Sequence, residues 1–533
     1  MKLVLAAIHI EPSPRAVPLG PAMLASVLGA AFPQALETRI LDLFLDQPAE
    51  ACAEAILASE PDAVGLSIYV WNRTLFREIA LLLRSRKPGL VLFAGGPEAT
   101  ADSAGILTEG TLDFVLPGEG EGLILEAMGR LLRGEKVLGT QQPVPVPDLA
   151  PLPSPYLDGT LDLKDYSGVL WELSRGCPFQ CDFCYESRGT AGIRRVPMAR
   201  IEAELAAFVA AGIPEVFVLD PTFNFHKPQA KAILRLIAER APGIHFFFEI
   251  RSEFIDEEMA QLFAAIRCTL QIGLQSAHDE VLRQINRTID LHDFEAKLLL
   301  LHQAGAPYGF DLIYGLPGDS LEGFCASVNF AMSLVPNHLD VFRLSVLPGT
   351  RLAETAAGLG LEYLSANPYS VTATSTFGPE DMARAARIAQ GCDALYNHGR
   401  AVPWFGIVLE ALDRPASEVF EAFAAFLEGR TDEDLTLVQR DFVRTLFQER
   451  GDDLMGTIAA DIVSYFGYSG ELLESPDGEA HRRVFFQHNP LELLAEMQAG
   501  NTNLEELVFC VATEPCQALL FLEDGEVVIQ VES

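Results

Sequence analysis

The sequence has little cysteine, few positive charges and no long uninterrupted hydrophobic run. Nine cysteines in 533 residues are too few for a disulfide scaffold and suit a reducing compartment. Lys and Arg total 38 against 74 Asp and Glu, so the formal net charge is −36, which disfavours binding to nucleic acid and to anionic membranes. The apolar stretch 17–32 is shorter than a spanning helix and contains glycine and proline. We therefore expect a soluble, cytoplasmic protein with no nucleic-acid or membrane partner.

The remaining composition indicates large folded domains. Apolar residues make up 49% and charged residues 21%, which is a globular mixture. At roughly 150 residues per domain, the length predicts three or four domains. Six prolines within residues 143–155 indicate an extended linker. We therefore expect a first domain at 1–138, a proline-rich linker at 139–165, a second domain at 166–378 and a C-terminal region at 379–533.

Residues 1–135 alternate short apolar segments with helical patterns. Strands are expected at 2–8, 37–41, 63–68, 90–94 and 113–116. Short connections between strands and helices favour a doubly wound, Rossmann-like α/β domain with a mostly parallel sheet. Ligands of such folds bind outside the carboxyl ends of the strands. The candidate contact residues at those ends are Ser67, Tyr69, Trp71, Asn72, Gly95, Gly96, Pro97, Glu98, Gly118, Glu119 and Gly120.

The same alternation resumes with longer units from residue 169 to about 350. Strands are expected at 169–174, 215–219, 244–250, 269–273, 308–313 and 339–346. Six βα units are too few for a closed eight-stranded barrel and predict an open, partial (β/α)6 barrel, with its chemistry at the carboxyl ends of the strands. The C-terminal region is predicted to be mostly helical, with helices at 381–398, 416–427 and 434–448. Its end, 516–522 and 527–531, is predicted to form a β-hairpin.

Three of the nine cysteines, Cys177, Cys181 and Cys184, fall within eight residues in the loop after the first strand of the second domain. This C-x3-C-x2-C spacing lets three thiolates wrap one compact metal centre. A structural zinc site wants four protein ligands, but no fourth cysteine is near and the next histidine is His226. A [4Fe–4S] cluster held by three cysteines keeps one iron open to a ligand. A zinc site with a distant fourth ligand stays as the alternative.

The cysteine motif resembles the signature of the radical S-adenosylmethionine (SAM) superfamily, in which an aromatic residue, here Phe183, precedes the last cysteine. The resemblance implies that the three cysteines hold a catalytic [4Fe–4S] cluster and that SAM chelates its open iron. Reduction, by an electron donor such as flavodoxin or ferredoxin, would then produce a 5′-deoxyadenosyl radical. Polar residues at other strand ends match positions that contact SAM in the family, and Arg251 or Arg287 could pair with its carboxylate. The candidates are Asp220, Asn224, Glu249, Arg251, Gln275, Ser276, Arg287 and Asp311.

An α/β domain joined by a proline-rich linker to such a core is similar to the cobalamin-dependent branch of the superfamily. The resemblance implies that the strand-end residues of 1–138 bind cobalamin, with glycines that permit close approach and with Ser67 and Asn72 bonded to its amide-rich rim. The sequence lacks the D-x-H-x-x-G motif by which many cobalamin proteins supply a histidine to cobalt, and His9 is the only histidine before residue 150. Tyr69 or Trp71 could cover that face of cobalt, and ordinary core packing is the alternative.

The resemblance implies a methyltransferase that acts on an unactivated carbon of a small molecule or peptide, through a 5′-deoxyadenosyl radical and methylcobalamin. Members with the same cofactors also catalyse rearrangement or cyclisation, and a member that has lost cobalamin is a further alternative. An RNA methylthiotransferase would carry additional cysteines in the first domain, where this chain has only Cys52. The acidic charge also opposes RNA binding. A non-catalytic iron–sulfur or zinc binding module is the alternative from another class.

Overall fold

The computed structural model describes residues 1–186, 192–430, 434–474, 481–523 and 525–532. Its internal contacts divide the chain into two units. Unit 1 comprises Met1–Gly273, Leu282–Pro307 and Leu344–Ser375, and unit 2 comprises Leu274–Val281, Tyr308–Arg343 and Thr376–Ser533. The domain boundaries at residues 138, 165 and 378 stay predictions.

Unit 1 begins with a six-stranded parallel sheet in the order β2-β1-β3-β4-β5-β6. Strand β1 is buried from Leu3 to Ile8, as expected of a parallel strand that is covered on both faces. The edge strand β2 is more exposed. The strands are β1 (Lys2–His9), β2 (Glu37–Phe44), β3 (Ala63–Ser67), β4 (Val91–Gly95), β5 (Phe114–Val115) and β6 (Gly139–Thr140).

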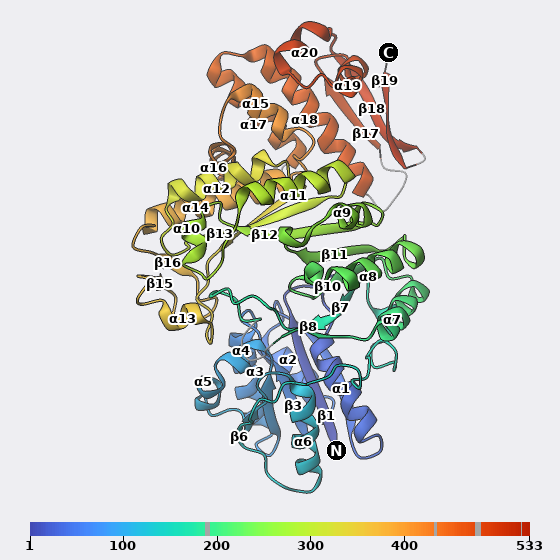
Figure 1. The fold of residues 1–533 in the computed structure, drawn as a ribbon, viewed down its shortest axis with the longest axis vertical. Coiled ribbons are helices and arrows are strands. Elements are labelled where there is room, and N and C mark those ends of the chain that lie inside the picture. Colours follow the sequence, from blue (N-terminus) through green and yellow to red (C-terminus); the bar gives the residue numbers. More distant parts are fainter. Residues whose placement is uncertain (187–191, 431–433, 475–480, 524, 533) are drawn as a thin grey trace. The chain divides into compact units, whose positions relative to one another are not determined.

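Helices cover both faces of this first sheet (Figure 1). One core packs the sheet against α2 and α3, and a second core packs it against α1 and α6. This arrangement is the predicted doubly wound fold. The helices are α1 (Leu19–Ala31), α2 (Ala49–Leu57), α3 (Arg73–Arg86), α4 (Pro97–Ala101), α5 (Ser103–Thr108) and α6 (Gly120–Leu132).

The rest of unit 1 carries the first βα units of the second domain. Strands β7, β10, β11 and β12 pair in parallel in this order, and a short antiparallel ladder of β8 with β9 flanks the cysteine loop. The strands are β7 (Val169–Trp171), β8 (Ser174–Arg175), β9 (Arg194–Arg195), β10 (Glu215–Val218), β11 (His245–Ile250) and β12 (Cys268–Gln275). The helices are α7 (Met198–Ala211), α8 (Lys227–Arg240), α9 (Glu257–Ala264), α10 (Asp279–Arg283) and α11 (Leu291–Ala304). Helix α13 (Arg351–Thr355) and the strands β15 (Glu362–Tyr363) and β16 (Val371–Ala373) close this unit.

Unit 2 contains the last two strands of the barrel portion and the C-terminal region. Strands β13 (Tyr308–Tyr314) and β14 (His338–Arg343) pair in parallel around helix α12 (Leu321–Ser333). The helices that follow are α14 (Pro379–Cys392), α15 (Phe405–Leu412), α16 (Ala416–Leu427), α17 (Leu435–Arg450), α18 (Asp453–Glu474), α19 (Pro490–Gln498) and α20 (Leu504–Cys510). The antiparallel strands β17 (His481–Phe486), β18 (Cys516–Glu523) and β19 (Glu526–Glu532) share an apolar core with α18.

The predicted fold class is confirmed: a Rossmann-like first sheet, a second set of parallel βα units, a mostly helical C-terminal region and a terminal hairpin of β18 and β19. The expected strand 339–346 is wrong at its end, because β14 stops at Arg343 and the chain turns to pair with residues 369–371. Helix α18 and strand β17 were not predicted.

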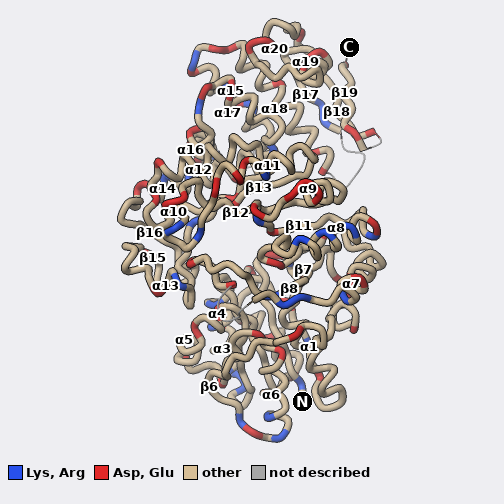
Figure 2. The backbone as a smooth tube through the Cα atoms, viewed as in Figure 1, with Lys and Arg blue, Asp and Glu red and all other residues tan. Residues whose placement is uncertain are grey.

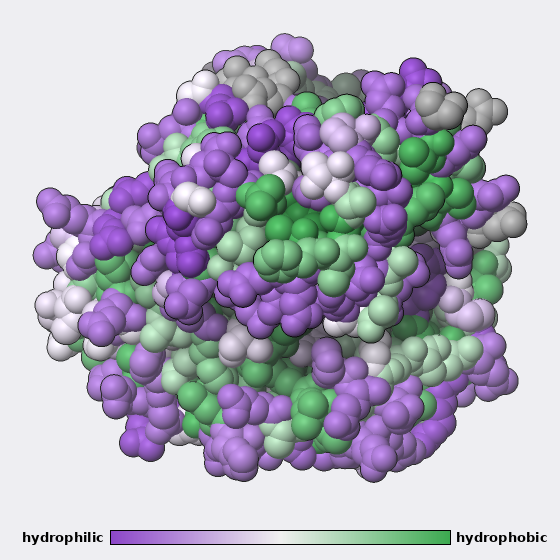
Figure 3. Space-filling model, turned by 90° about the horizontal axis from the view of Figure 1, so that it is seen from above, coloured by the Kyte–Doolittle hydropathy of each residue, from purple (hydrophilic) through white to green (hydrophobic). Residues whose placement is uncertain are grey.

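The surface agrees with the composition. Acidic residues are spread along both units rather than gathered in one segment (Figure 2), and hydrophilic residues separate the apolar areas on the face in Figure 3. No helix in the described ranges is both long enough and apolar enough to cross a membrane.

Candidate functional site

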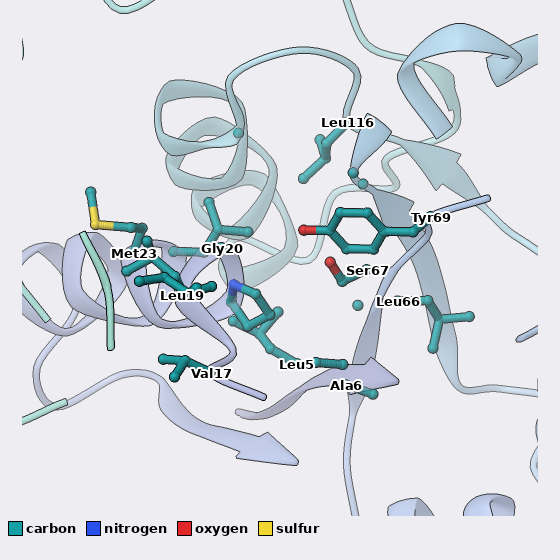
Figure 4. Close-up of a pocket in the computed structure, with 18 of the residues that line it drawn as sticks. Leu5, Ala6, Val17, Leu19, Gly20, Met23, Leu66, Ser67, Tyr69 and Leu116 are labelled. Carbon is teal, nitrogen blue, oxygen red and sulfur yellow. The ribbon is translucent and has the colours of Figure 1, made fainter. Parts of the chain in front are cut away.

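A cavity of about 530 Å³ lies at the carboxyl ends of the strands of the first sheet. Strand β1 contributes residues 5–9 and β3 contributes residues 65–67, and the loops after β4 and β5 complete the wall. The sheet order reverses between β1 and β3, which is where ligands of open α/β sheets bind. The volume lies in the usual range of cofactor sites, roughly 300–1,000 Å³. In Figure 4, apolar side chains of Leu5, Val17 and Leu19 lie on one side, across from Ser67 and Tyr69.

Two glycines shape this cavity. A Cβ atom at Gly96 would lie 2.6 Å from the Ile68 carbonyl oxygen, and the φ of Gly96 is +98°, a conformation that other residues rarely adopt. A Cβ atom at Gly65 would lie 2.6 Å from the ring of Phe93. The chain can therefore pass closely under the cavity only because these positions lack side chains. This cradle, together with the apolar wall, fits a large planar cofactor such as cobalamin.

The loop after β3 forms an aromatic wall. Tyr69 stacks on Trp71 with ring centroids 4.4 Å apart, and Trp71 Nε1 donates a hydrogen bond to the Ile8 carbonyl at 3.2 Å. Burial raises the pKa of Tyr69, whereas a hydrogen bond with Ser67 lowers it. Ser67, Tyr69 and Trp71 all line the cavity, as do the predicted residues Gly95, Gly96, Gly118, Glu119 and Gly120.

Three residues predicted at this site do not line the cavity: Asn72, Pro97 and Glu98. Asn72 is fully buried, accepts from the Tyr69 N–H at 2.8 Å and donates to the carbonyls of Ile8 and Ser67. The Asn72 amide therefore holds the loop after β3, and its contact with the cofactor rim stays a prediction. Glu98 is also buried and bonds to Arg73 and to the hydroxyl of Tyr369.

The cysteine loop follows β8 in unit 1. Its three cysteines fall within eight residues, and the charge of Cys181 raises the pKa of both Cys177 and Cys184. Burial raises the pKa of Cys177 and raises that of Cys184 to about 12. Across the described residues, no three His, Cys, Asp or Glu side chains have the geometry of a site for a single metal ion. Three thiols in one loop are the donor set of a [4Fe–4S] cluster. The cluster is wider than a single ion, so the three sulfur atoms need not approach one common point.

Two predicted SAM contacts, Asp220 and Asn224, bind backbone groups near the cysteine loop. Asp220 accepts from the N–H groups of Leu173 and Ser174, both at 2.9 Å, and from the Ser174 hydroxyl at 2.6 Å. Burial raises the pKa of Asp220 to about 6 despite these hydrogen bonds. Asn224 is fully buried and exchanges hydrogen bonds with the backbone of Arg251.

Arg251 and Arg287 stand beside the same loop. The Arg251 guanidinium lies 3.8 Å from the ring centroid of Phe179, a residue between the first two cysteines, and its Nε bonds to Glu253 at 3.1 Å. Arg287 donates to the Gly273 carbonyl, while its Nε is buried with no partner among the described residues. Burial lowers the pKa of Arg287, and the charge of Arg251 lowers it further. A buried, unsatisfied guanidinium donor here suits an anionic ligand.

The remaining predicted SAM residues are Glu249, Gln275, Ser276 and Asp311. Glu249 is exposed on β11, and Gln275, Ser276 and Asp311 belong to unit 2. Gln275 has a φ of +68°, and its buried Oε1 has no partner in the part of the chain that the structure describes. The Ser276 hydroxyl lies 3.4 Å from that of Ser327.

An ionic cluster that the sequence did not reveal joins the cavity to the cysteine loop. Arg175, two residues before Cys177, bonds to Glu121 at 2.6 Å and to Glu172 at 2.8 Å and lies 3.6 Å from Glu119. Glu119 also binds Arg194 through both oxygens and accepts from the Val146 N–H at 2.7 Å. Burial raises the pKa of Glu119, but Arg194, Val146 and Arg175 outweigh it and lower that pKa. The only signal in the sequence was the position of Arg175 beside the motif.

Family models match both of these regions. The model of the B12 binding domain matches residues 8–127, and that of the radical SAM superfamily matches residues 171–331. The first therefore implies cobalamin, and the second implies a [4Fe–4S] cluster and SAM.

Two curated methyltransferases are similar to this chain, and the first is named for the pairing of cobalamin with radical SAM chemistry. The cobalamin-dependent radical SAM methyltransferase TokK of Streptomyces tokunonensis is 27% identical over 350 residues, which are 58% of this chain and 50% of TokK. The 2-(S-pantetheinyl)-carbapenam-3-carboxylate methyltransferase of Streptantibioticus cattleyicolor is 27% identical over 391 residues, 66% of this chain and 56% of that enzyme. The chain thus spans about half the length of these curated relatives.

A solved structure is similar in fold. The radical SAM methyltransferase TsrM from Kitasatospora setae, with cobalamin and a [4Fe–4S] cluster bound, superimposes with a TM-score of 0.57 at 19% identity. The match covers 84% of this chain and 99% of TsrM. At this identity the similarity bears on the fold alone.

Proposed function

Because the chain belongs to the cobalamin-dependent radical SAM family, we propose that it transfers a methyl group from SAM to an unactivated carbon of a small molecule or peptide. When bound, cobalamin would carry the methyl group and the reduced cluster would cleave SAM to a 5′-deoxyadenosyl radical. The methyl group acquired by the substrate replaces a hydrogen atom that this radical removes.

The observation that carries the proposal is the common wall of the two sites. Leu170, Glu172, Arg175 and Leu219, from the second domain, line the same cavity as the glycine cradle. Arg175 is separated from Cys177 by a single residue, and it pairs with Glu119 and Glu121, which come from the first domain and also line the cavity. A cavity whose wall includes a residue two positions before the first cysteine suits a reaction in which a radical and a methyl carrier act on one substrate.

The residues divide into three groups by role: ligands of the cluster, contacts of SAM and positioning residues. Cys177, Cys181 and Cys184 would bind the cluster, and Arg251 with Arg287 would bind the carboxylate of SAM by charge-assisted hydrogen bonds. Asp220 and Asn224 would act as positioning residues, because their polar atoms hold backbone groups. The residues Glu249, Gln275, Ser276 and Asp311 are proposed as further contacts of SAM.

The partners follow from the chemistry. The cluster needs a one-electron donor such as flavodoxin or ferredoxin, and three free thiols with no disulfide favour the reducing cytoplasm. The net charge of −36 favours a metabolite or peptide over nucleic acid as the substrate.

The proposal is tested with the full chain, reconstituted without oxygen with iron, sulfide and hydroxocobalamin. After gel filtration, the protein should retain both corrin and iron, and SAM with dithionite should produce 5′-deoxyadenosine. Labelled methyl groups from SAM should then appear on a candidate metabolite. A protein that retains iron and cleaves SAM but holds no corrin would contradict the methyltransferase and favour a cobalamin-free radical enzyme.

A further inference from the structure

The charged side chains that line the cavity are almost all paired. Glu119, Glu121 and Glu172 share the guanidinium of Arg175, and Arg194 adds a second cation to Glu119. His9 pairs with Asp42, with 2.7 Å between its Nε2 and the carboxylate. Each carboxylate that lines the cavity therefore already has a cationic partner before any ligand enters.

Arg15 is the exception among the described cavity residues. It lies in the loop between β1 and α1, is exposed, and makes no side-chain hydrogen bond or ion pair within the described chain. The chain has 74 acidic and only 38 basic residues, so carboxylate partners for an arginine are plentiful. Arg15 nevertheless has none in the described ranges, and it lines a cavity of the size of a cofactor site.

The orientation of Arg15 is set by aromatic rings. Its guanidinium carbon lies 4.4 Å from the ring centroid of Phe217 and 5.4 Å from that of Phe247, and these two rings stack at 4.3 Å. Cation–π contact of this kind fixes the guanidinium over an apolar surface and leaves its N–H edge available. Phe217 lies on β10 and Phe247 on β11, so Arg15 reaches from the first domain to the strands of the barrel.

We propose that Arg15 is an anion-recognition residue of this cavity, which binds a phosphate or carboxylate group of the occupant through bidentate, charge-assisted hydrogen bonds. The inference rests on the proposed function for the identity of the occupant. Two sources supply such an anion: the nucleotide phosphate of cobalamin, and an acidic group on the substrate. In the second case, Arg15 restricts the substrates to carboxylates or phosphate esters.

The test uses inorganic phosphate as the probe, with binding followed by 31P NMR line broadening at constant ionic strength. The full chain is titrated without cobalamin and after loading with hydroxocobalamin. We expect Arg15→Gln to weaken phosphate binding about tenfold, because it removes a charged bidentate donor, and Arg15→Lys to weaken it less. Arg39→Gln is the matched control, since Arg39 is an exposed arginine on β2 that bonds to Ser59 outside the cavity.

Loading separates the two sources of the anion. Arg15-dependent binding that disappears on loading assigns Arg15 to the phosphate of cobalamin, and binding that persists assigns it to the substrate. Equal phosphate binding by the wild type, Arg15→Gln and Arg39→Gln overturns the proposal. If the chain fails to retain cobalamin, the proposed function fails, whereas the unloaded titration still decides the role of Arg15.

Discussion

The cavity and the cysteine loop are built by opposite means, although both lie in unit 1. The cavity depends on missing side chains: Gly65 and Gly96 leave space that a Cβ atom would fill. The cysteine loop depends on buried polar groups, since Asp220, Asn224 and Arg251 hold its surroundings by hydrogen bonds and a cation–π contact. A cavity that exists because side chains are missing tolerates a range of contacts with its ligand. A loop held by satisfied hydrogen bonds fixes the position of each of its polar groups.

This difference predicts that the two sites fail separately. Replacing any of Cys177, Cys181 or Cys184 by alanine should abolish iron retention and the production of 5′-deoxyadenosine, because two thiolates do not hold the cluster. Hydroxocobalamin should still be retained. Cys510→Ala, at an exposed cysteine, is the control and should leave iron content unchanged. Loss of corrin together with iron would show that the two sites form one cooperative structure.

A second prediction concerns the support of the cysteine loop. The pKa of Asp220 is raised from 3.8 to about 6, so the folded chain binds a proton that the unfolded chain releases, and stability falls as the pH rises through this window. Relative to Asp220→Asn, the free energy of unfolding of the wild type should fall by roughly 2 kcal/mol between about pH 4 and pH 6. Denaturant titrations of the cofactor-free chain measure this difference. If the free energy of unfolding changed with pH in the same way for both proteins, the raised pKa of the Asp220 carboxyl would be contradicted.

A third prediction tests the cradle. Gly96→Ala should lower the stability by roughly 1–3 kcal/mol more than Gly110→Ala, because a methyl group at Gly96 meets the Ile68 carbonyl. Gly110 is the matched control, since its φ of +74° is equally unusual but its Cβ would meet nothing within 4 Å. Corrin retention by gel filtration should fall for Gly96→Ala alone, with iron content unchanged. Equal corrin retention in both variants would show that the cavity does not depend on a glycine at position 96.

The smallest loss of stability is expected at Tyr369, whose partner Glu98 does not line the cavity. Tyr369→Phe removes the hydroxyl that contacts Glu98 and accepts from Arg73 at 3.2 Å, which should cost about 1 kcal/mol in thermal or denaturant unfolding. Tyr363→Phe, at a more exposed tyrosine, is the control. A loss no greater than that of the control would mean that Arg73 alone satisfies Glu98.

The sequence predicted the two sites unequally well, for physical reasons. Glycines at strand ends and the cysteine spacing are local signals, so Gly96 and Cys177–Cys184 could be selected from the sequence alone. Polar residues at strand ends are a weaker signal. Asn72 and Asp220 both accept hydrogen bonds from backbone N–H groups, and the neighbouring sequence does not distinguish a residue with this role from one that contacts a ligand. The partners of Arg175 could not be predicted, because Glu121 lies 54 residues away and only the fold brings them together.

The fold follows the same rule. Strand β1 and helix α16 were predicted because each has a continuous or periodic apolar pattern of its own. The end of β14 was misplaced because residues 344–346 are apolar enough for a strand but pair with residues 369–371. The edge strand β17 was missed because four of its six residues are exposed and its partner β18 lies about thirty residues later.

The decisive experiment reconstitutes the full chain without oxygen and measures iron and corrin in the same gel-filtered sample, with SAM cleavage measured after reduction. We predict both cofactors in one protein, and production of 5′-deoxyadenosine that Cys184→Ala abolishes. Iron without corrin, or corrin with no cleavage of SAM, would contradict the account.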